Sequence, residues 1–265
     1  MKGSQRVSRL RELKKSGEKI ASLTAYDASF ARLLEKAGID FVLVGDSLGM
    51  VLQGEADTLK VSMEDMIYHT RLVSRGLQQT LLVADMPCNS YTDSVQALNN
   101  ARRLINEGGA HMVKLEGGSE ILDQVKSLCQ NGVAVCGHLG LQPQSVHKYG
   151  GYKVQGRNEE DAGRILADAI ALEHAGVDMI VLECIPRLLA AKISVALSIP
   201  TIGIGAGVDC DGQILVMYDV IGLSGYIPKM ANDFLQQGGS ISTAVSNYIT
   251  AVKNGTFPTS AQSFD

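Results

Sequence analysis

Residues 179–204, MIVLECIPRLLAAKISVALSIPTIGI, contain two short apolar runs separated by a stretch with helical periodicity. The runs Met179–Leu182 and Thr201–Ile204 show no polar alternation, which predicts strands that are buried on both faces of a parallel sheet. Between them, Arg187–Leu197 has apolar residues at the spacing of an amphipathic helix. This order of elements predicts a βαβ unit.

The same alternation runs through the whole chain. The expected strands are Ile20–Ala25, Phe41–Gly45, Leu81–Asp85, Met112–Leu115, Ala134–Gly137, Met179–Leu182, Thr201–Ile204 and Gly225–Pro228. The expected helices are Ser29–Ala37, Met63–Arg75, Ser94–Glu107, Glu120–Gln130, Glu159–His174, Arg187–Leu197, Gly212–Ile221 and Ile241–Lys253. Because no linker interrupts eight such units, the sequence predicts an α/β fold, a single (β/α)8 TIM barrel over residues 1–265 with a short cationic N-terminal helix. A doubly wound dinucleotide fold would have G-x-G-x-x-G after its first strand, and LTAYDASF lacks it.

The amino-acid composition argues against several classes of binding partner. The 265 residues are 45% hydrophobic and 20% charged with a net charge of −4, which argues against a nucleic-acid binder. No apolar run approaches the roughly 18 residues that span a bilayer, and the basic N-terminus lacks the apolar stretch of a signal peptide. Five scattered cysteines without a C-x-x-C pair argue against a disulfide framework and a thiolate zinc site. We expect a cytoplasmic protein without a membrane partner.

Charged residues end several successive strands, and in a barrel these ends meet at the face that carries the chemistry. Asp46 follows the second expected strand, Asp85 ends the third, and Glu116 follows the fourth. Each Asp, taken alone, is equally well explained as a cap of the following helix. Three carboxylates at one height would repel one another, however, and their oxygens suit a hard divalent cation, most plausibly Mg²⁺.

Three further residues are candidates for substrate chemistry. Lys114 lies two residues before Glu116 and shares its face of the strand, where it can be a purely structural ion pair or can bind an anionic substrate group. Glu183 ends a wholly apolar strand and is either a structural carboxylate or a proton acceptor. His138 is a core histidine bound to a backbone carbonyl or an assistant to that proton transfer.

The glycine-rich run PTIGIGAGVDCDGQ, residues 200–213, has two interpretations of equal weight. Its glycines can allow backbone N–H groups to approach a phosphate, or they can open a strand end into a pocket.

Several long motifs, in order, resemble the 3-methyl-2-oxobutanoate hydroxymethyltransferase (ketopantoate hydroxymethyltransferase) family. They are LTAYDASFARLLEKAGID, VGDSLGMVLQG, ADMPCNSY, VKLEGG, GHLGLQPQSV, GGYKVQGR and IGIGAGVDCDGQILV. The resemblance extends from about residue 4 to the C-terminal tail, and TFPTSAQSF in that tail is the weakest match.

The resemblance implies a barrel of the phosphoenolpyruvate/pyruvate type that assembles as a large homo-oligomer, often a decamer. The implied reaction, the first step of pantothenate biosynthesis, moves a hydroxymethyl unit from 5,10-methylenetetrahydrofolate to 3-methyl-2-oxobutanoate through a metal-stabilised enolate. The implied metal ligands are Asp46, Asp85 and Glu116. The implied oxo acid contacts are Asp46, Ser47, Asp85 and Lys114, and the implied proton acceptor is Glu183.

Two alternatives differ in what they predict. Another Mg²⁺-dependent 2-oxo acid lyase of the same barrel superfamily would act without folate. A non-catalytic ligand-binding barrel would need none of Asp46, Asp85, Lys114, Glu116 and Glu183, all of which are present.

Overall fold

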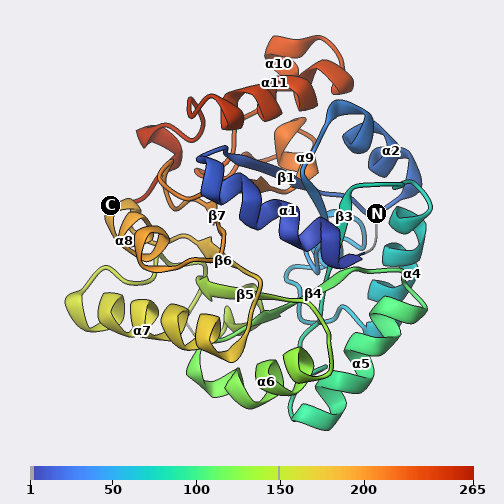
Figure 1. Ribbon diagram of the computed structural model, residues 1–265. Coiled ribbons are helices and arrows are strands. Elements are labelled where there is room, and N and C mark those ends of the chain that lie inside the picture. Colours follow the sequence, from blue (N-terminus) through green and yellow to red (C-terminus); the bar gives the residue numbers. More distant parts are fainter. Residues whose placement is uncertain (1–2, 149) are drawn as a thin grey trace.

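Eight parallel strands close into a barrel in which each strand pairs with the next and β8 pairs with β1 (Figure 1). The computed structural model describes residues 3–148 and 150–265. The strands are β1 (Ile20–Thr24), β2 (Phe41–Val44), β3 (Leu81–Asp85), β4 (Met112–Glu116), β5 (Val135–Gly140), β6 (Met179–Glu183), β7 (Thr201–Ile204) and β8 (Gly212–Leu215). The expected (β/α)8 barrel is therefore confirmed.

Helices surround the barrel (Figure 1). They are α1 (Gly3–Ser16), α2 (Ala28–Ala37), α3 (Leu48–Val51), α4 (Met63–Ser74), α5 (Ser94–Asn106), α6 (Leu122–Gln130), α7 (Glu159–Ala175), α8 (Arg187–Ala196), α9 (Met217–Val220), α10 (Leu235–Gly238) and α11 (Ile241–Lys253), with 3₁₀ turns at Ser119–Ile121, Pro143–Ser145 and Ser260–Gln262. Side-chain caps fix where several begin: the Asp27 carboxylate accepts from two backbone N–H groups, and Ser62 and Asp65 form a capping box.

The barrel has an outer and an inner apolar layer. Strand residues that point outward, such as Val113 and Leu115, pack against the surrounding helices. Residues that point inward, such as Met112, fill the interior together with Val7 and Leu10 of α1. Alternate strand residues therefore face inward, which brings Lys114 and Glu116 into the interior as expected.

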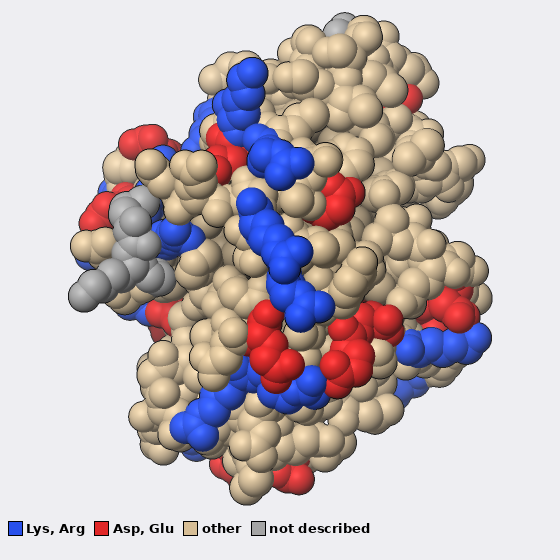
Figure 2. All heavy atoms as spheres, turned by 90° about the vertical axis from the view of Figure 1, so that its right-hand side faces the viewer, with Lys and Arg blue, Asp and Glu red and all other residues tan. Residues whose placement is uncertain are grey.

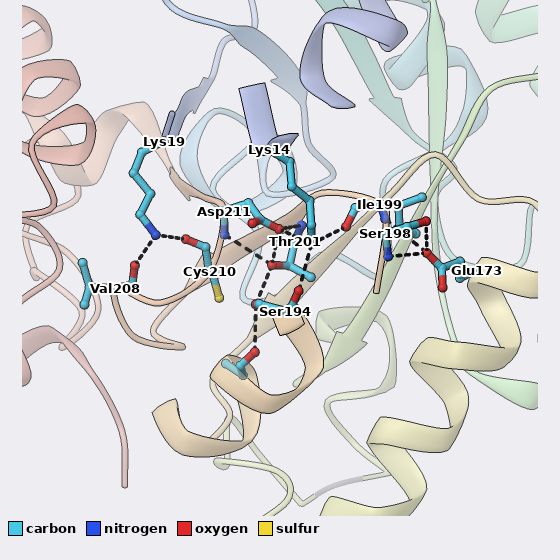
Figure 3. Close-up of polar contacts among 11 residues, drawn as sticks. Lys14, Lys19, Glu173, Ser194, Ser198, Ile199, Thr201, Val208, Cys210 and Asp211 are labelled. Carbon is cyan, nitrogen blue, oxygen red and sulfur yellow. Dashed lines mark hydrogen bonds and ion pairs between the residues drawn. The ribbon is translucent and has the colours of Figure 1, made fainter. Parts of the chain in front are cut away.

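Helix α1 crosses the amino-terminal end of the barrel and closes it (Figure 1). Lys14 Nζ donates to the carbonyls of Ser194 and Ile199 and pairs with Asp211, each at 2.8–2.9 Å (Figure 3). Lys19 Nζ donates to the carbonyls of Val208 and Cys210 at 2.9 and 2.6 Å. The cationic segment thus binds the last part of α8 and the loops before β7 and β8.

The eighth strand differs from the expectation. Gly212–Leu215 forms β8, whereas the sequence predicted a helix over Gly212–Ile221, and Gly225–Pro228 forms turn and loop instead of a strand. The apolar residues of Gly212–Ile221 also fit helical spacing. Periodicity therefore predicted one helix where the chain forms a four-residue strand followed by a short helix.

The glycine-rich run supplies β7, the connection 205–211 and the start of β8, without an intervening helix. Gln213 Nε2 donates to the Gly207 carbonyl at 2.9 Å and holds this connection against the barrel. Two of its carbonyls, those of Val208 and Cys210, bind Lys19 at the closed end. Ile204, the last residue of β7 in this run, lines a cavity at the carboxyl end of the barrel, which supports the interpretation that the run opens a strand end into a pocket. The phosphate cradle stays a prediction.

The face over α2, α4 and α5 carries both signs of charge (Figure 2). Arg103 of α5 pairs with Glu64 at 2.8 Å and with Glu107 at 2.9 Å.

None of the described helices combines the length and apolar character that crossing a bilayer requires.

Candidate active site

The charged residues singled out from the sequence line one cavity at the carboxyl ends of the strands. The cavity has a volume of about 1020 Å³. Its polar end is lined by Asp46 and Ser47 after β2, Asp85 of β3, Lys114 and Glu116 of β4, His138 of β5 and Glu183 of β6. Parallel strands place these side chains together because all eight carboxyl ends meet at this face.

Asp46 and Asp85 are adjacent and buried. The Asp46 backbone N–H donates to Asp85 Oδ2 at 3.0 Å, so the two carboxylates lie on the same side of the barrel mouth. Burial, Asp85 and Glu116 raise the pKa of Asp46 well above its usual value. Burial also raises the pKa of Asp85, against the opposing effect of Lys114. Both carboxylates would gain from additional positive charge.

Lys114 lies among these acids. Its Nζ is 2.6 Å from Asp85 Oδ1 and 3.9 Å from Glu116 Oε1. Burial acts to lower the pKa of Lys114, but Asp85, Glu116 and Asp46 outweigh it and raise that pKa. The ammonium group is therefore held protonated, as a point charge for an anion rather than as a nucleophile.

His138 bridges two carboxylates. Its Nδ1 is 3.2 Å from Glu116 Oε1, and its Nε2 is 3.1 Å from Glu183 Oε2 although not in hydrogen-bond alignment. Burial and Lys114 act to lower the pKa of His138, but Glu116 and Glu183 raise it to about 9. The interpretation as a core histidine bound to a backbone carbonyl is wrong, because its partners are acidic side chains.

Glu116 is held from two sides. Its Oε2 accepts from the backbone N–H of Gln144 at 3.0 Å, and its Oε1 faces His138 and Lys114. Burial acts to raise the pKa of Glu116, but these two cationic side chains outweigh it and lower that pKa. Lys114 and His138 thus favour the ionised form of Glu116.

Ser47 faces the same cavity. Its Oγ is 2.9 Å from the hydroxyl of Tyr26, which follows β1. A Cβ at Gly45 would lie 2.8 Å from Ser47 Oγ, so a larger residue there would displace the Ser47 hydroxyl.

Sequence reasoning missed Gln144, which connects the acids. Its Nε2 donates to Asp46 Oδ2 at 2.8 Å and to the Met86 carbonyl at 2.9 Å. Its Oε1 accepts from the Tyr91 hydroxyl at 2.6 Å. Gln144 follows Pro143 in a loop, where no strand end or periodicity marks a site residue, and only its place in the motif GHLGLQPQSV pointed to it.

The carboxylates of this cluster fit a hard divalent cation that also takes ligands from water and substrate. Among the side chains described, no three His, Cys, Asp or Glu residues converge closely enough to hold an ion unaided. The cluster nevertheless has four carboxylates against two cationic side chains, Lys114 and His138, so negative charge is in excess. An ion such as Mg²⁺, which takes one or two carboxylates and completes its shell with water and substrate oxygens, suits these donors.

The five cysteines are free thiols. Cys136, Cys184 and Cys210 are buried, and burial raises the pKa of Cys136 and of Cys210 to about 12. Cys184 lines the cavity, and burial raises its pKa as well, which disfavours the reactive thiolate.

Comparisons with known proteins find full-length matches. The family model of ketopantoate hydroxymethyltransferase matches residues 4–260. A 3-methyl-2-oxobutanoate hydroxymethyltransferase of Halorhodospira halophila is 53% identical over 263 residues, covering 99% of this chain and 96% of its own length. One from Shewanella sediminis is 55% identical over 259 residues, covering 97% and 98%.

Solved structures show the same fold at low identity. Phosphonopyruvate hydrolase in complex with oxalate and Mg²⁺ aligns with a TM-score of 0.62 and 16% identity over 82% of this chain and 81% of that chain. 2,3-Dimethylmalate lyase, a member of the PEP mutase/isocitrate lyase superfamily, aligns with a TM-score of 0.58 and 15% identity over 89% of each chain. These likenesses show the barrel fold.

Proposed function

The chain belongs to the ketopantoate hydroxymethyltransferase family, and on that premise we propose how the residues of its barrel mouth carry out the reaction. Its activity is that of a 3-methyl-2-oxobutanoate hydroxymethyltransferase in pantothenate biosynthesis, because relatives with this activity match almost its whole length at more than half identity. The observation that supports the site is the cluster of buried, oppositely charged side chains on β2 to β6.

Asp46, Asp85 and Glu116 would hold Mg²⁺ or another divalent cation, together with oxygens of water and of the oxo acid. When bound, this cation polarises the keto group of the oxo acid and makes its C3 proton easier to remove. The raised pKa values of Asp46 and Asp85 support this assignment, since both carboxylates are short of positive charge in the protein alone.

Lys114 and Ser47 bind the oxo acid beside the carboxylates. The Lys114 ammonium group is buried and protonated, so it attracts the substrate's negative oxygens and stabilises charge that develops on them. Ser47 lies between Asp46 and the Tyr26 hydroxyl and presents its own hydroxyl to the cavity.

Glu183 takes the C3 proton. Its side chain is 14% exposed and lines the cavity, so it can approach a bound substrate, and one of its oxygens is held beside His138 Nε2. With a pKa of about 9, His138 is an imidazolium at neutral pH, and it orients Glu183 instead of accepting a proton from it. The substrate carbon that has lost the proton then forms a bond to the methylene carbon of the folate. The two C–N bonds of that methylene carbon break, water supplies the hydroxyl group of the product, and the two folate nitrogens take up the C3 proton and one proton of the water as tetrahydrofolate leaves.

The co-substrate is 5,10-methylenetetrahydrofolate, and the reaction takes place in the cytoplasm. The assembly is a homo-oligomer, a decamer as the family resemblance implies. The free cysteines, three of them buried, are compatible with a reducing compartment.

Product analysis tests the reaction. The protein is incubated with 3-methyl-2-oxobutanoate and Mg²⁺, with and without 5,10-methylenetetrahydrofolate. We expect 2-dehydropantoate only in the presence of folate. Cleavage of a 2-oxo acid without folate would instead support a lyase of the same barrel superfamily, and no turnover of any substrate would support a non-catalytic barrel.

A further inference from the structure

The cavity is much larger than the oxo acid requires. Its volume of about 1020 Å³ lies at the upper end of the roughly 300–1,000 Å³ that holds a drug-sized ligand. The charged cluster on β2 to β6 occupies one end of it. The other end is lined by residues of β8 and of the segment after it, from Ile214 to Met230, and by Phe264. The cavity as a whole therefore has room for a larger molecule beside the oxo acid.

One buried carboxylate lines this second part. Asp219 of α9 is 9% exposed, and its Oδ1 accepts from the Ser224 hydroxyl at 2.6 Å. In the described part of the chain no cationic side chain pairs with Asp219, and Ser224 is its side-chain hydrogen-bond partner. Burial raises the pKa of Asp219, opposed by Ser224. A buried carboxylate with so few donors gains from a ligand that supplies N–H groups.

The surroundings of Asp219 suit a flat ring. Tyr218 lines the cavity, and its ring centroid lies 5.9 Å from that of Tyr26 and 6.2 Å from that of Phe30. The charge of Asp219 also acts on Tyr26, whose hydroxyl is 2.9 Å from Ser47 Oγ. Asp219 is therefore close to Tyr26, which lies between this part of the cavity and the oxo acid site at Ser47.

We propose that Asp219 is the binding residue for the pteridine ring of the folate co-substrate, and that its carboxylate accepts two hydrogen bonds from the ring N3–H and the 2-amino group. This inference rests on the proposed function, because it assigns the folate half of that same site. The two donors form a planar pair that matches both oxygens of a carboxylate, and Asp219 Oδ1 keeps a second lone pair besides the one used by Ser224.

Binding in this way also orients the reacting group. In a reduced pteridine the 2-amino edge and N5 lie on opposite sides of the ring. With the 2-amino edge at Asp219, N5 and its methylene group point away from that carboxylate, toward Tyr26, Ser47 and the oxo acid. Holding the two reactants in this order is what a carbon–carbon bond-forming site has to achieve.

The test compares Asp219→Asn with the wild type. The asparagine keeps the size of the side chain and the bond to Ser224 but replaces one acceptor oxygen by a donor. We expect the KM for 5,10-methylenetetrahydrofolate to rise about tenfold or more, because hydrogen bonds to a buried charge are lost and a ligand donor is left unpaired. Folate-independent exchange of the oxo acid C3 proton should stay within about twofold, because that step uses Glu183. Asp209→Asn, the same change at an exposed residue outside the cavity, is the control.

A second measurement does not depend on the variant folding well. Calorimetric titration of the wild type should show about tenfold weaker binding of 2-desaminotetrahydrofolate than of tetrahydrofolate, and Asp219→Asn should bind the two within about twofold of each other. Equal binding of both ligands by the wild type, or an unchanged folate KM in Asp219→Asn, would overturn the inference. If the wild type forms no 2-dehydropantoate, the proposed function fails, and the titration still decides the role of Asp219.

Discussion

The two ends of the barrel pair their charged side chains in opposite ways. At the amino-terminal end, the ammonium groups of Lys14 and Lys19 bind carbonyl oxygens and Asp211 at 2.6–2.9 Å (Figure 3). At the carboxyl end, four carboxylates line the cavity, and among the described residues of their cluster the cationic side chains are Lys114 and His138. Carboxylates therefore outnumber positive charges at this end.

This difference distinguishes charges that stabilise the fold from charges that are available for function. Charges whose partners are all supplied by the chain stabilise the fold and have nothing left to offer a ligand. Charges that the chain leaves partly unpaired reduce the stability of the fold and are available for a ligand. Arg6 at the closed end is a partial exception, since its Nε lacks a partner while NH1 and NH2 donate to the Thr80 and Gln78 carbonyls.

The largest effect is expected at Asp46. Asp46→Asn should lower turnover about 10³-fold or more, because stabilisation of developing charge by a bound metal is worth several kcal/mol. The free energy of unfolding at pH 7 should not fall. The raised pKa of Asp46 means that its charged form disfavours the fold above the pKa of the unfolded chain.

Steady-state kinetics and urea denaturation at pH 7 check both parts for Asp46→Asn, with Asp209→Asn as the matched control. Near-normal turnover would show that Asp46 does not serve the metal. A large loss of stability would place Asp46 with the fully paired charges of the closed end.

The second-largest effect is expected when the proton acceptor, Glu183, is replaced. Glu183→Gln should slow C3 proton exchange about 10²-fold or more, because general base catalysis contributes at least that factor. The affinity for the oxo acid should be retained, since Lys114 and the metal ligands are intact. Exchange is followed by proton NMR in deuterated solvent, with Glu160→Gln on the exposed face of α7 as the control. Persistent exchange would move the base elsewhere, with His138 the first residue to examine.

Gln144 should have an intermediate effect. Gln144→Ala removes the donor to Asp46 Oδ2 while the backbone bond to Glu116 remains. Residues that orient metal ligands typically change metal affinity about 10–100-fold, and we expect a loss in this range for Mg²⁺ activation. Activity as a function of Mg²⁺ concentration measures it, with Gln79→Ala, exposed at the other end of the barrel, as the control. An unchanged activation curve would leave Gln144 with a purely structural role.

The smallest effect on activity is expected at the closed end. Lys14→Met leaves Asp211 and two carbonyls without their donor, and should lower the free energy of unfolding by about 1–3 kcal/mol. The kcat of the folded variant should change less than twofold. Lys15→Met, one residue along on the exposed face of α1, should change neither quantity. A loss of kcat without a loss of stability in Lys14→Met would contradict the division between the two ends.

Most of the fold could be predicted from the sequence because buried parallel strands are uniformly apolar and the helices between them are periodic. The expected strands Met179–Leu182 and Thr201–Ile204 match β6 and β7 to within one residue. The eighth strand could not be predicted, since β8 has four residues and no helix separates it from β7. Its place is set by pairing with β1, a contact between residues far apart in the sequence.

The site could be predicted only where strands position it. Asp85, Lys114 and His138 lie at strand ends whose common height follows from the barrel itself. Gln144 and Asp219 lie in segments after a strand, and their places depend on packing that periodicity does not encode. For the same reason the sequence did not show that His138 lies between Glu116 and Glu183.

The division between the two ends is tested most directly by C3 proton exchange of 3-methyl-2-oxobutanoate in deuterated solvent, without folate, on metal-stripped protein. If the unpaired carboxylates hold a cation that acidifies the oxo acid, exchange should be absent after treatment with a chelator and restored by Mg²⁺. Exchange at the same rate with and without the metal would contradict this, and would show that the charges at the open end act without a cation.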